Sequence, residues 1–530
     1  MMEEADFVII GGGTAGCVLA NRLTANGRHA VCLLEAGGAD RSPWIHIPLG
    51  YGKLASHPRY SICFESEPEP ALNGRRLSIP RARVLGGCSS TNGLLYVRGQ
   101  AQDYDDWAAA GNAGWGYADI LPYFRRAEDY HGGESEWHGA GGPIAVSPPA
   151  APHPLAEAFI AAGQQQGLPR LDDFNGAGQE GVGYYHMTTR HVRRSSAATA
   201  YLRPARRRSN LCVLKEAVAT RILFDGKRAV GVEFTRQGET RRVMARREVI
   251  LSGGAIASPH LLLLSGVGPG SALADLGISV VLDRAGVGRN LADHANIRLN
   301  YRASRPITMN DRLRTPMGRL GAGLEYVFRR KGPLTVSAGF GAAFYRTSPE
   351  LDRPDFQGYL LLFRTDASGT GLEPFSGFMT SGYQLRPESR GELFLKSADP
   401  MARPGIRLNH LVSEKDRMVT LAGIKRLRAM LREPAMAPLV AESEPGDGAD
   451  DEELMAYIRE HAGTGHHVAG TCHMGVGSDA VVDPRLKAHG LAGLRVVDAS
   501  IMPAMVSGNT CAPVVMIAEK AADMILEDSQ

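Results

Sequence analysis

A glycine-rich loop near the N-terminus constrains the fold of this chain more than any other feature. The pattern G-x-G-x-x-G at residues 11–16 follows an apolar stretch, Phe7 to Ile10, and precedes helical spacing over residues 15–23. A second apolar stretch covers Ala30 to Leu34. Strand, glycine turn, helix and strand form a βαβ unit, so a parallel sheet is predicted.

Each position of this loop has a physical role in binding a dinucleotide. Gly11 makes the tight turn, Gly13 lets the backbone approach a pyrophosphate, and Gly16 lets the helix pack close to the strand. The helix N-terminus, which includes Thr14 and Ala15, presents free N–H groups to the phosphates. We therefore expect all five residues to bind a cofactor.

An acidic residue stands at the distance that such a loop requires. Glu35 ends the second strand about twenty residues after the glycines, and Ala36 follows it. The Glu35 carboxylate can accept hydrogen bonds from ribose hydroxyls. This favours a ribose without a 2′-phosphate, so FAD or NAD is expected rather than NADP, and the loop alone does not separate these two.

The remaining chain predicts more than one domain. The 530 residues exceed one ordinary core. Alternating residues around a turn at Asp225-Gly226 predict an antiparallel hairpin or meander from Leu211–Leu214, Ala229–Phe234 and Arg242–Leu251. Helices are expected over residues 255–265, 415–430 and 514–525. Since no Ser/Gly linker divides the chain, the domains are expected to be interleaved.

Composition and charge argue against several classes of protein. A net charge of +3 gives no reason to expect nucleic acid as a partner. Seven scattered cysteines without a CxxC pair indicate reduced thiols in the cytoplasm and no metal site. The acidic N-terminus does not resemble a signal peptide, and no apolar run is long enough for a transmembrane segment. Peripheral contact with the inner membrane stays open.

Longer motifs carry a resemblance to a known family. They are RARVLGGCSSTNG at Arg81–Gly93, GAIASPHLLLLSGVG at Gly254–Gly268, GVGRNLADH at Gly286–His294, VVDASIMP at Val496–Pro503 and SGN at Ser507–Asn509. Together they resemble the glucose-methanol-choline (GMC) oxidoreductases, in the order expected of that family. The pattern is most similar to bacterial choline, sorbose and aliphatic alcohol dehydrogenases.

The resemblance implies FAD and an α/β fold, α+β overall. A Rossmann-like FAD-binding domain is interleaved with a substrate domain built on an antiparallel sheet with helices. The predicted FAD-binding parts are residues 1–150, 196–296 and 461–530, and the substrate parts are residues 151–195 and 297–460. The residues implied to contact the cofactor are Val84, Gly86, Gly87, Asn92, Gly93, Leu94, Val218, Asp498 and Ala499.

One position departs from part of the family. Some members carry a histidine that bonds covalently to the flavin where Thr91 stands here. Threonine cannot form that bond, so we expect non-covalent FAD.

The catalytic residues are expected in two C-terminal loops. GHHVAGTC at Gly465–Cys472 is similar to the family's His-Pro-x-Gly-Thr-Cys stretch, which places His467 at the catalytic position and Val468 at the proline. Histidine suits the role of base because its pKa lies near neutral pH. Asn509 falls at the second position, where it can donate to the substrate oxygen but cannot act as a base. Both assignments are interpretations of the resemblance.

Other histidines are expected to be structural. His466 is interpreted as a packing or pocket-wall residue, and contact with the substrate is the alternative. The sequence supplies no partner for His191, His294 or His410. Adjacent histidines without a third ligand do not predict a metal site.

These features predict FAD-dependent oxidation of an alcohol to an aldehyde or ketone. His467 would act as the base, the substrate hydride would reach flavin N5, and electrons would pass to a quinone-like acceptor. The alternatives are an oxidase that reduces oxygen to hydrogen peroxide, a lyase or photoenzyme of the same fold, and a non-catalytic flavoprotein. The alcohol, the acceptor and the oligomeric state stay open, and no cage for choline can be placed.

Overall fold

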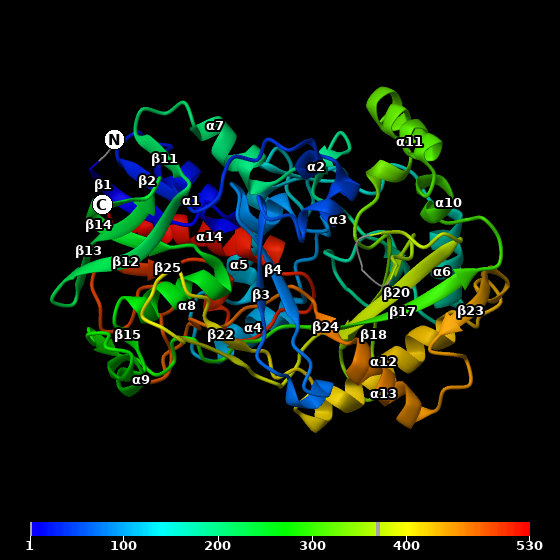
Figure 1. The fold of residues 1–530 in the computed structure, drawn as a ribbon. Coiled ribbons are helices and arrows are strands. Elements are labelled where there is room, and N and C mark those ends of the chain that lie inside the picture. The colour runs from blue at the N-terminus through cyan, green and yellow to red at the C-terminus, as the bar shows by residue number, and fades with distance from the viewer. Residues whose placement is uncertain (1–2, 367–370, 530) are drawn as a thin grey trace.

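The computed structural model describes residues 3–366 and 371–529. Two large sheets organise these residues, one towards each end of the molecule (Figure 1). Both chain ends lie beside the first sheet. Across the described residues, no helix is both long and apolar enough to cross a membrane.

The first sheet is built on the predicted βαβ unit. Strand β1 (Glu4–Ile10) pairs in parallel with β2 (Val31–Glu35) and with β14 (Glu239–Leu251), and helix α1 (Thr14–Leu23) connects β1 to β2. All five residues of β2 are buried, as the apolar run predicts. The other strands are β11 (Leu211–Lys215), β12 (Ala217–Asp225), β13 (Arg228–Arg236) and β25 (Leu494–Val496).

The predicted meander is partly wrong. Strands β12, β13 and β14 are antiparallel neighbours, with the turn after Asp225 between the first two. Strand β11, however, pairs in parallel with β2 on the far side of the sheet. Glu216, between β11 and β12, has a left-handed backbone with φ 56°. This residue redirects the chain, so sequence neighbours part to opposite edges.

The second sheet is mainly antiparallel and combines segments far apart in sequence. Its spatial order is β23-β17-β20-β19-β18-β8-β7, with β24 paired to β17. The strands are β7 (Arg170–Leu171), β8 (Gly181–Tyr184), β17 (Ala295–Ala303), β18 (Gly341–Tyr345), β19 (Phe356–Leu361), β20 (Gly377–Gln384), β23 (Val440–Glu444) and β24 (Gly463–Thr464).

Five pairs of short strands form separate two-stranded sheets within the described residues. They pair β3 (Ser61–Glu65) with β4 (Ser78–Ala82), β5 (Glu128–Tyr130) with β6 (Ile144–Val146), β9 (Thr189–Arg190) with β10 (Arg193–Arg194), β15 (Val267–Gly268) with β16 (Leu282–Asp283), and β21 (Glu392–Phe394) with β22 (Gly405–Arg407).

The helices cover the sheets and confirm the helical predictions. Helix α14 (Cys511–Glu527) packs on α1, and α12 (Glu414–Met430) packs on β19 and β20. The predicted helix at residues 255–265 is α8 (Gly254–Leu264). The others are α2 (Pro43–His46), α3 (Tyr51–Leu54), α4 (Ala101–Ala109), α5 (Tyr117–Ala127), α6 (Pro154–Gln165), α7 (Arg203–Ala205), α9 (Gly270–Asp275), α10 (Met309–Leu313), α11 (Pro316–Arg329) and α13 (Asp451–His461).

The predicted α/β fold class is confirmed by this architecture. The first sheet takes strands from residues 4–35, 211–251 and 494–496, whereas the second takes them from 170–184, 295–384 and 440–464. The domain boundaries given above stay a proposal.

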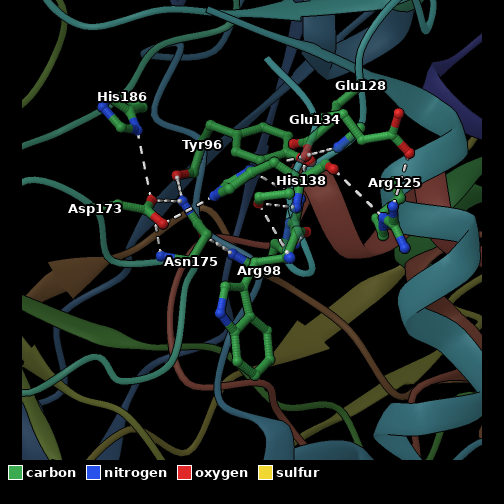
Figure 2. Close-up of polar contacts among 12 residues, drawn as sticks. Tyr96, Arg98, Arg125, Glu128, Glu134, His138, Asp173, Asn175 and His186 are labelled. Carbon is green, nitrogen blue, oxygen red and sulfur yellow. Dashed lines mark hydrogen bonds and ion pairs between the residues drawn. The ribbon is translucent and has the colours of Figure 1, made fainter. Parts of the chain in front are cut away.

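A buried ionic network joins residues from separate segments of the chain (Figure 2). Arg98 Nη2 donates to Glu128 Oε1 over 2.5 Å, and both side chains are almost fully buried. His138 Nδ1 lies 2.9 Å from Glu128 Oε1, and its Nε2 lies 2.9 Å from Asp173 Oδ2. Because a carboxylate only accepts, we assign both ring nitrogens as donors. Burial would lower the pKa of His138, but the hydrogen bonds to the two carboxylates raise it.

This network predicts a large difference between two glutamates. Glu128→Gln removes the charge that compensates the buried Arg98 and should lower the free energy of unfolding by about 3–5 kcal/mol. Glu134→Gln breaks the exposed pair with Arg125 and should change it by less than about 1 kcal/mol. Urea unfolding of both variants measures this, and equal losses would contradict the role given to the network.

Candidate active site

The predicted cofactor loop leaves the carboxyl end of β1 and enters α1. Gly11 has φ 105°, which favours glycine, and a Cβ on Gly16 would overlap the carbonyl oxygen of Gly11. A Cβ on Gly13 would meet nothing closer than 3.7 Å. Gly13 also precedes α1 without a side-chain cap, so the first N–H groups at Thr14 and Ala15 have no capping side chain.

A second glycine turn lies directly against this loop. Gly86 N donates to Gly12 O over 2.8 Å, and a Cβ on Gly87 would come within 2.7 Å of Gly13 Cα. Gly86 and Gly87 both have positive φ, 87° and 53°. The structure thus brings together two glycine segments that are about seventy residues apart, as both predictions require.

Glu35 is held by the same loop. Its Oε2 accepts from Gly12 N over 2.8 Å and its Oε1 from Gly37 N over 2.6 Å. Glu216 N donates to Gly37 O over 3.0 Å, which places the start of β12 beside Ala36 and Gly37. Val218 lies two residues further, half-buried in β12. Glu35, Ala36 and Val218 are therefore neighbours at one end of the predicted cofactor site.

Asp498 closes the site at the carboxyl ends of β14 and β25. Its Oδ2 accepts from Gly254 N and Ser258 Oγ, and its Oδ1 accepts from Ser500 N and Ser500 Oγ. Its carboxylate therefore already ties the start of α8 to the turn that begins at Ala499.

The segment after the Gly86–Gly87 turn rests on a buried arginine that the sequence reasoning missed. Arg194 donates to Asn92 Oδ1 over 2.6 Å, to Asn92 O over 2.7 Å, to Ser89 O over 3.2 Å and to Ile45 O over 2.7 Å. Burial lowers the pKa of Arg194 to about 9. The only sequence signal was a pair of arginines in a stretch without a motif.

Not every predicted contact residue faces open space. Val84 and Leu94 are fully buried, Val84 against Ile45 and Leu54. Gly93 is packed so closely on Ala338 that a Cβ would overlap that side chain. Contacts of these three residues with a cofactor stay predictions.

His467 and Asn509 meet, although they lie on separate loops. Asn509 Nδ2 is 3.0 Å from His467 Nε2. Gln357 Nε2 lies 3.4 Å from Asn509 Oδ1 and donates to it, which orients the Asn509 amide with its NH₂ group towards His467. The two predicted catalytic side chains are therefore within hydrogen-bond distance of each other in the structure.

The other ring nitrogen of His467 contacts His294. The two Nδ1 atoms are 2.9 Å apart, and His294 Nε2 is 2.9 Å from Leu385 O. A carbonyl only accepts, so His294 Nε2 carries its proton and its Nδ1 accepts from His467 Nδ1. We therefore assign neutral His467 a lone pair at Nε2, which accepts from Asn509 Nδ2.

The sequence supplied no partner for His294, and the structure provides one in His467, 173 residues away. The segment Gly286–His294 carried the signal, since it ends on this residue. His410 lies near the same cluster, with its Nε2 3.5 Å from Asp293 Oδ2. Asp293 Oδ1 accepts from His467 N over 2.7 Å, and Thr464 Oγ1 donates to Oδ2.

The loop geometry explains how these side chains are positioned. Ala292 and Ala469 exchange both backbone hydrogen bonds, so the strand that carries His294 runs antiparallel to the loop that carries His467. Tyr383 stacks on His294 and meets His467 edge-on, with ring centroids 5.6 Å apart. His466 is exposed and has φ 63°, and Arg81 donates to its carbonyl oxygen.

Burial disfavours the protonated forms of the two histidines in this cluster, His294 and His467. Burial lowers the pKa of His467 well below 6.5, and the adjacent His294 lowers it further. Burial also lowers the pKa of His294 to about 4. For Asp293 burial acts to raise the pKa, but the hydrogen bonds and charge of its neighbours lower it. A neutral imidazole beside a fixed amide can accept a proton from a hydroxyl group.

Comparison with known proteins decides the family. Residues 5–296 match the N-terminal part and residues 387–518 the C-terminal part of the family described as GMC oxidoreductase. The chain belongs to the GMC oxidoreductase family. The predicted family is thus confirmed, and the protein is a flavoenzyme that acts on CH–OH groups with FAD as cofactor.

Several proteins are similar over nearly the whole chain. An oxygen-dependent choline dehydrogenase of Vibrio vulnificus is 41% identical over 99% of this chain and 95% of its own length. Among solved structures, pyridoxine 4-oxidase from Mesorbium loti is 30% identical with a TM-score of 0.89, covering 98% of both chains. A variant of Aspergillus oryzae formate oxidase studied for FAD modification is 27% identical with a TM-score of 0.93, covering 99% and 98%.

The chain's own residues fit this cofactor. The paired glycine turns leave no side chain between Gly13 and Gly87, and the uncapped N-terminus of α1 suits a pyrophosphate. Glu35 stands at the ribose distance with its carboxylate fixed.

The lowered pKa of His467 predicts a pH profile. The base must be neutral, so kcat/KM should stay constant from pH 8 to below pH 6.5 and fall only in more acidic solution. A wild-type profile that already falls at or above pH 6.5 would show that Nε2 is not held as the structure indicates.

Proposed function

We propose that this protein oxidises an alcohol to an aldehyde or ketone, with His467 as the base. The observation that carries the proposal is the pairing of the His467 Nε2 lone pair with Asn509 Nδ2 at 3.0 Å. When bound, FAD supplies the acceptor for the hydride that leaves the alcohol carbon.

His467 and Asn509 have complementary roles towards one hydroxyl group. His467 Nε2 takes the hydroxyl proton, and the imidazolium that forms keeps its Nδ1 hydrogen bond to His294. Asn509 Nδ2 carries two hydrogens, so it can donate to the oxygen as negative charge develops there. Asp293, which accepts from His467 N, stabilises the charged ring.

Two residues act as positioning groups for this pair. Gln357 orients Asn509, and its Nε2 also lies 2.5 Å from Tyr185 OH. His294 fixes the tautomer of His467 through the Leu385 carbonyl. This intact pair favours alcohol chemistry over a lyase, a photoenzyme or a non-catalytic role.

Choline is the first substrate to test. Relatives of 41–43% identity that span the chain are named for choline oxidation. A quaternary ammonium group binds to aromatic faces, and the half-buried Tyr359 lies with its ring centroid 6.3 Å from that of Tyr383, the ring that contacts His467. The structural neighbours named for pyridoxine and formate make a wider panel necessary.

The electron acceptor is proposed to be quinone-like, with oxygen as the second candidate. Oxygen stays a candidate because similar proteins carry the name oxygen-dependent choline dehydrogenase. Oxygen uptake and quinone reduction, measured on one sample with one alcohol, distinguish the two. We propose that the protein is cytoplasmic. Peripheral contact with the inner membrane would accompany a quinone-like acceptor.

The reaction is tested by anaerobic reduction of bound FAD. A panel of choline, benzyl alcohol, pyridoxine and straight-chain alcohols should contain at least one compound that bleaches the flavin absorbance. No bleaching by any alcohol would contradict alcohol oxidation.

The base is tested by substitution. His467→Ala should lower the rate of flavin bleaching by about 10²–10⁴-fold, which is the usual contribution of a positioned base. His461→Ala, on the exposed end of α13, is the matched control and should leave the rate unchanged. A His467→Ala rate within a few-fold of wild type would exclude this residue as the base.

FAD is proposed to be bound without a covalent bond. Thr91 stands at the position where some family members carry a flavinylated histidine, and threonine has no ring nitrogen. Acid precipitation should release all of the yellow colour into the supernatant. Flavin that stays with the pellet would contradict the proposal.

A further inference from the structure

Helix α11 carries a second apolar face that the fold does not use. Its inner face buries Ala322 and Tyr326, whose hydroxyl donates to Val192 O over 3.0 Å. The outer face presents large apolar side chains to solvent, with Met317 77% and Phe328 79% exposed. The full set is Met317, Leu320, Leu324, Val327 and Phe328.

These five side chains form one continuous stripe. Their spacing of three and four residues places them on the same side of a helix, opposite Ala322 and Tyr326. We call this set the outer stripe of α11. Figure 1 shows α11 standing away from the body of the molecule beside α10. Contiguous exposed apolar surface of this kind marks an interaction site.

The charges around the outer stripe are mainly positive. The exposed basic residues at the two ends of the helix are Arg312, Arg314, Arg319, Arg329, Arg330 and Lys331. Residues 311–331 contain two acidic side chains, and each already has a hydrogen-bond partner. Glu325 Oε2 accepts from Arg312 over 2.7 Å, and Asp311 Oδ2 accepts from Ser376 Oγ over 2.7 Å.

An apolar stripe flanked by basic residues matches an anionic lipid surface. The apolar side chains enter the boundary between headgroups and acyl chains, while the arginines and lysine contact the headgroups. We propose that α11 docks this protein on a membrane surface that contains anionic lipid. A second copy of the chain would bring the same positive charges together, which disfavours that occupant.

The position of α11 links this surface to the active site. The chain continues from α11 through Pro333–Thr335 to Ala338, which packs on Gly93. Docking through α11 would therefore involve the segment that leads to Gly93, one of the predicted flavin contacts. The inference concerns binding alone and does not depend on the proposed reaction.

Vesicle flotation of the FAD-loaded protein tests the proposal. The wild type should float with vesicles of phosphatidylcholine and phosphatidylglycerol, and much less with phosphatidylcholine alone or at high salt. The double variant Leu324→Glu/Phe328→Glu should bind at least about tenfold more weakly, because burying either side chain stabilises the bound state. Arg329→Gln/Arg330→Gln/Lys331→Gln should weaken binding to anionic vesicles by about fivefold per charge.

A matched control separates this surface from general hydrophobicity. Met418→Glu changes a side chain on α12 that is 63% exposed and should leave flotation unchanged. Flavin absorbance of every variant verifies that it is folded. A wild type that does not bind anionic vesicles, or a double variant that binds as the wild type does, overturns the proposal. A wild-type dimer that becomes a monomer in the double variant, without vesicle binding, identifies the stripe as a contact between copies and also overturns it.

Discussion

The backbone of the loop at residues 11–16 lies directly on the backbone of the turn at Gly86 and Gly87, joined by the hydrogen bond from Gly86 N to Gly12 O. A Cβ on Gly87 would come within 2.7 Å of Gly13 Cα, and Gly86 and Gly87 both have positive φ, so this turn requires glycine. This contact sets the path of residues 88–94, which Arg194 holds from the other side through Asn92. The same loop fixes Glu35. The predicted cofactor site therefore depends first on close packing of two backbone segments, which the side chains of Arg194 and Glu35 support.

The proposed chemistry depends on a second set of contacts, at the opposite sheet. A single backbone carbonyl, Leu385 O, determines the tautomer of His294, and His294 determines that of His467. Burial removes water from both rings, which favours their neutral forms. A base of low pKa is a weak proton acceptor on its own. In the proposed reaction, the nearby Asp293 carboxylate would compensate for this, since it would stabilise the imidazolium form of His467.

Much of the fold was predictable because local pattern and tertiary structure agree. The βαβ unit, α8, α12 and α14 appear where periodicity places them, since each buries the apolar face that its sequence displays. Strand β11 was misplaced because alternation of residues predicts a strand but not its neighbour. The chain changes direction at Glu216, whose backbone is left-handed, so β11 pairs with β2 and not with β12. The ionic network of Arg98, Glu128, His138 and Asp173 was invisible, because its members share no spacing.

The sequence by itself determined the family, the cofactor and the position of two catalytic candidates, because these depend on contiguous motifs in which glycines and a histidine have one use. Tertiary structure alone decided which nitrogen of His467 carries the lone pair, since that depends on His294 and Leu385 from other strands. Tertiary structure also showed which face of α11 is buried and which is exposed. The sequence could not, because α11 has apolar residues on both faces.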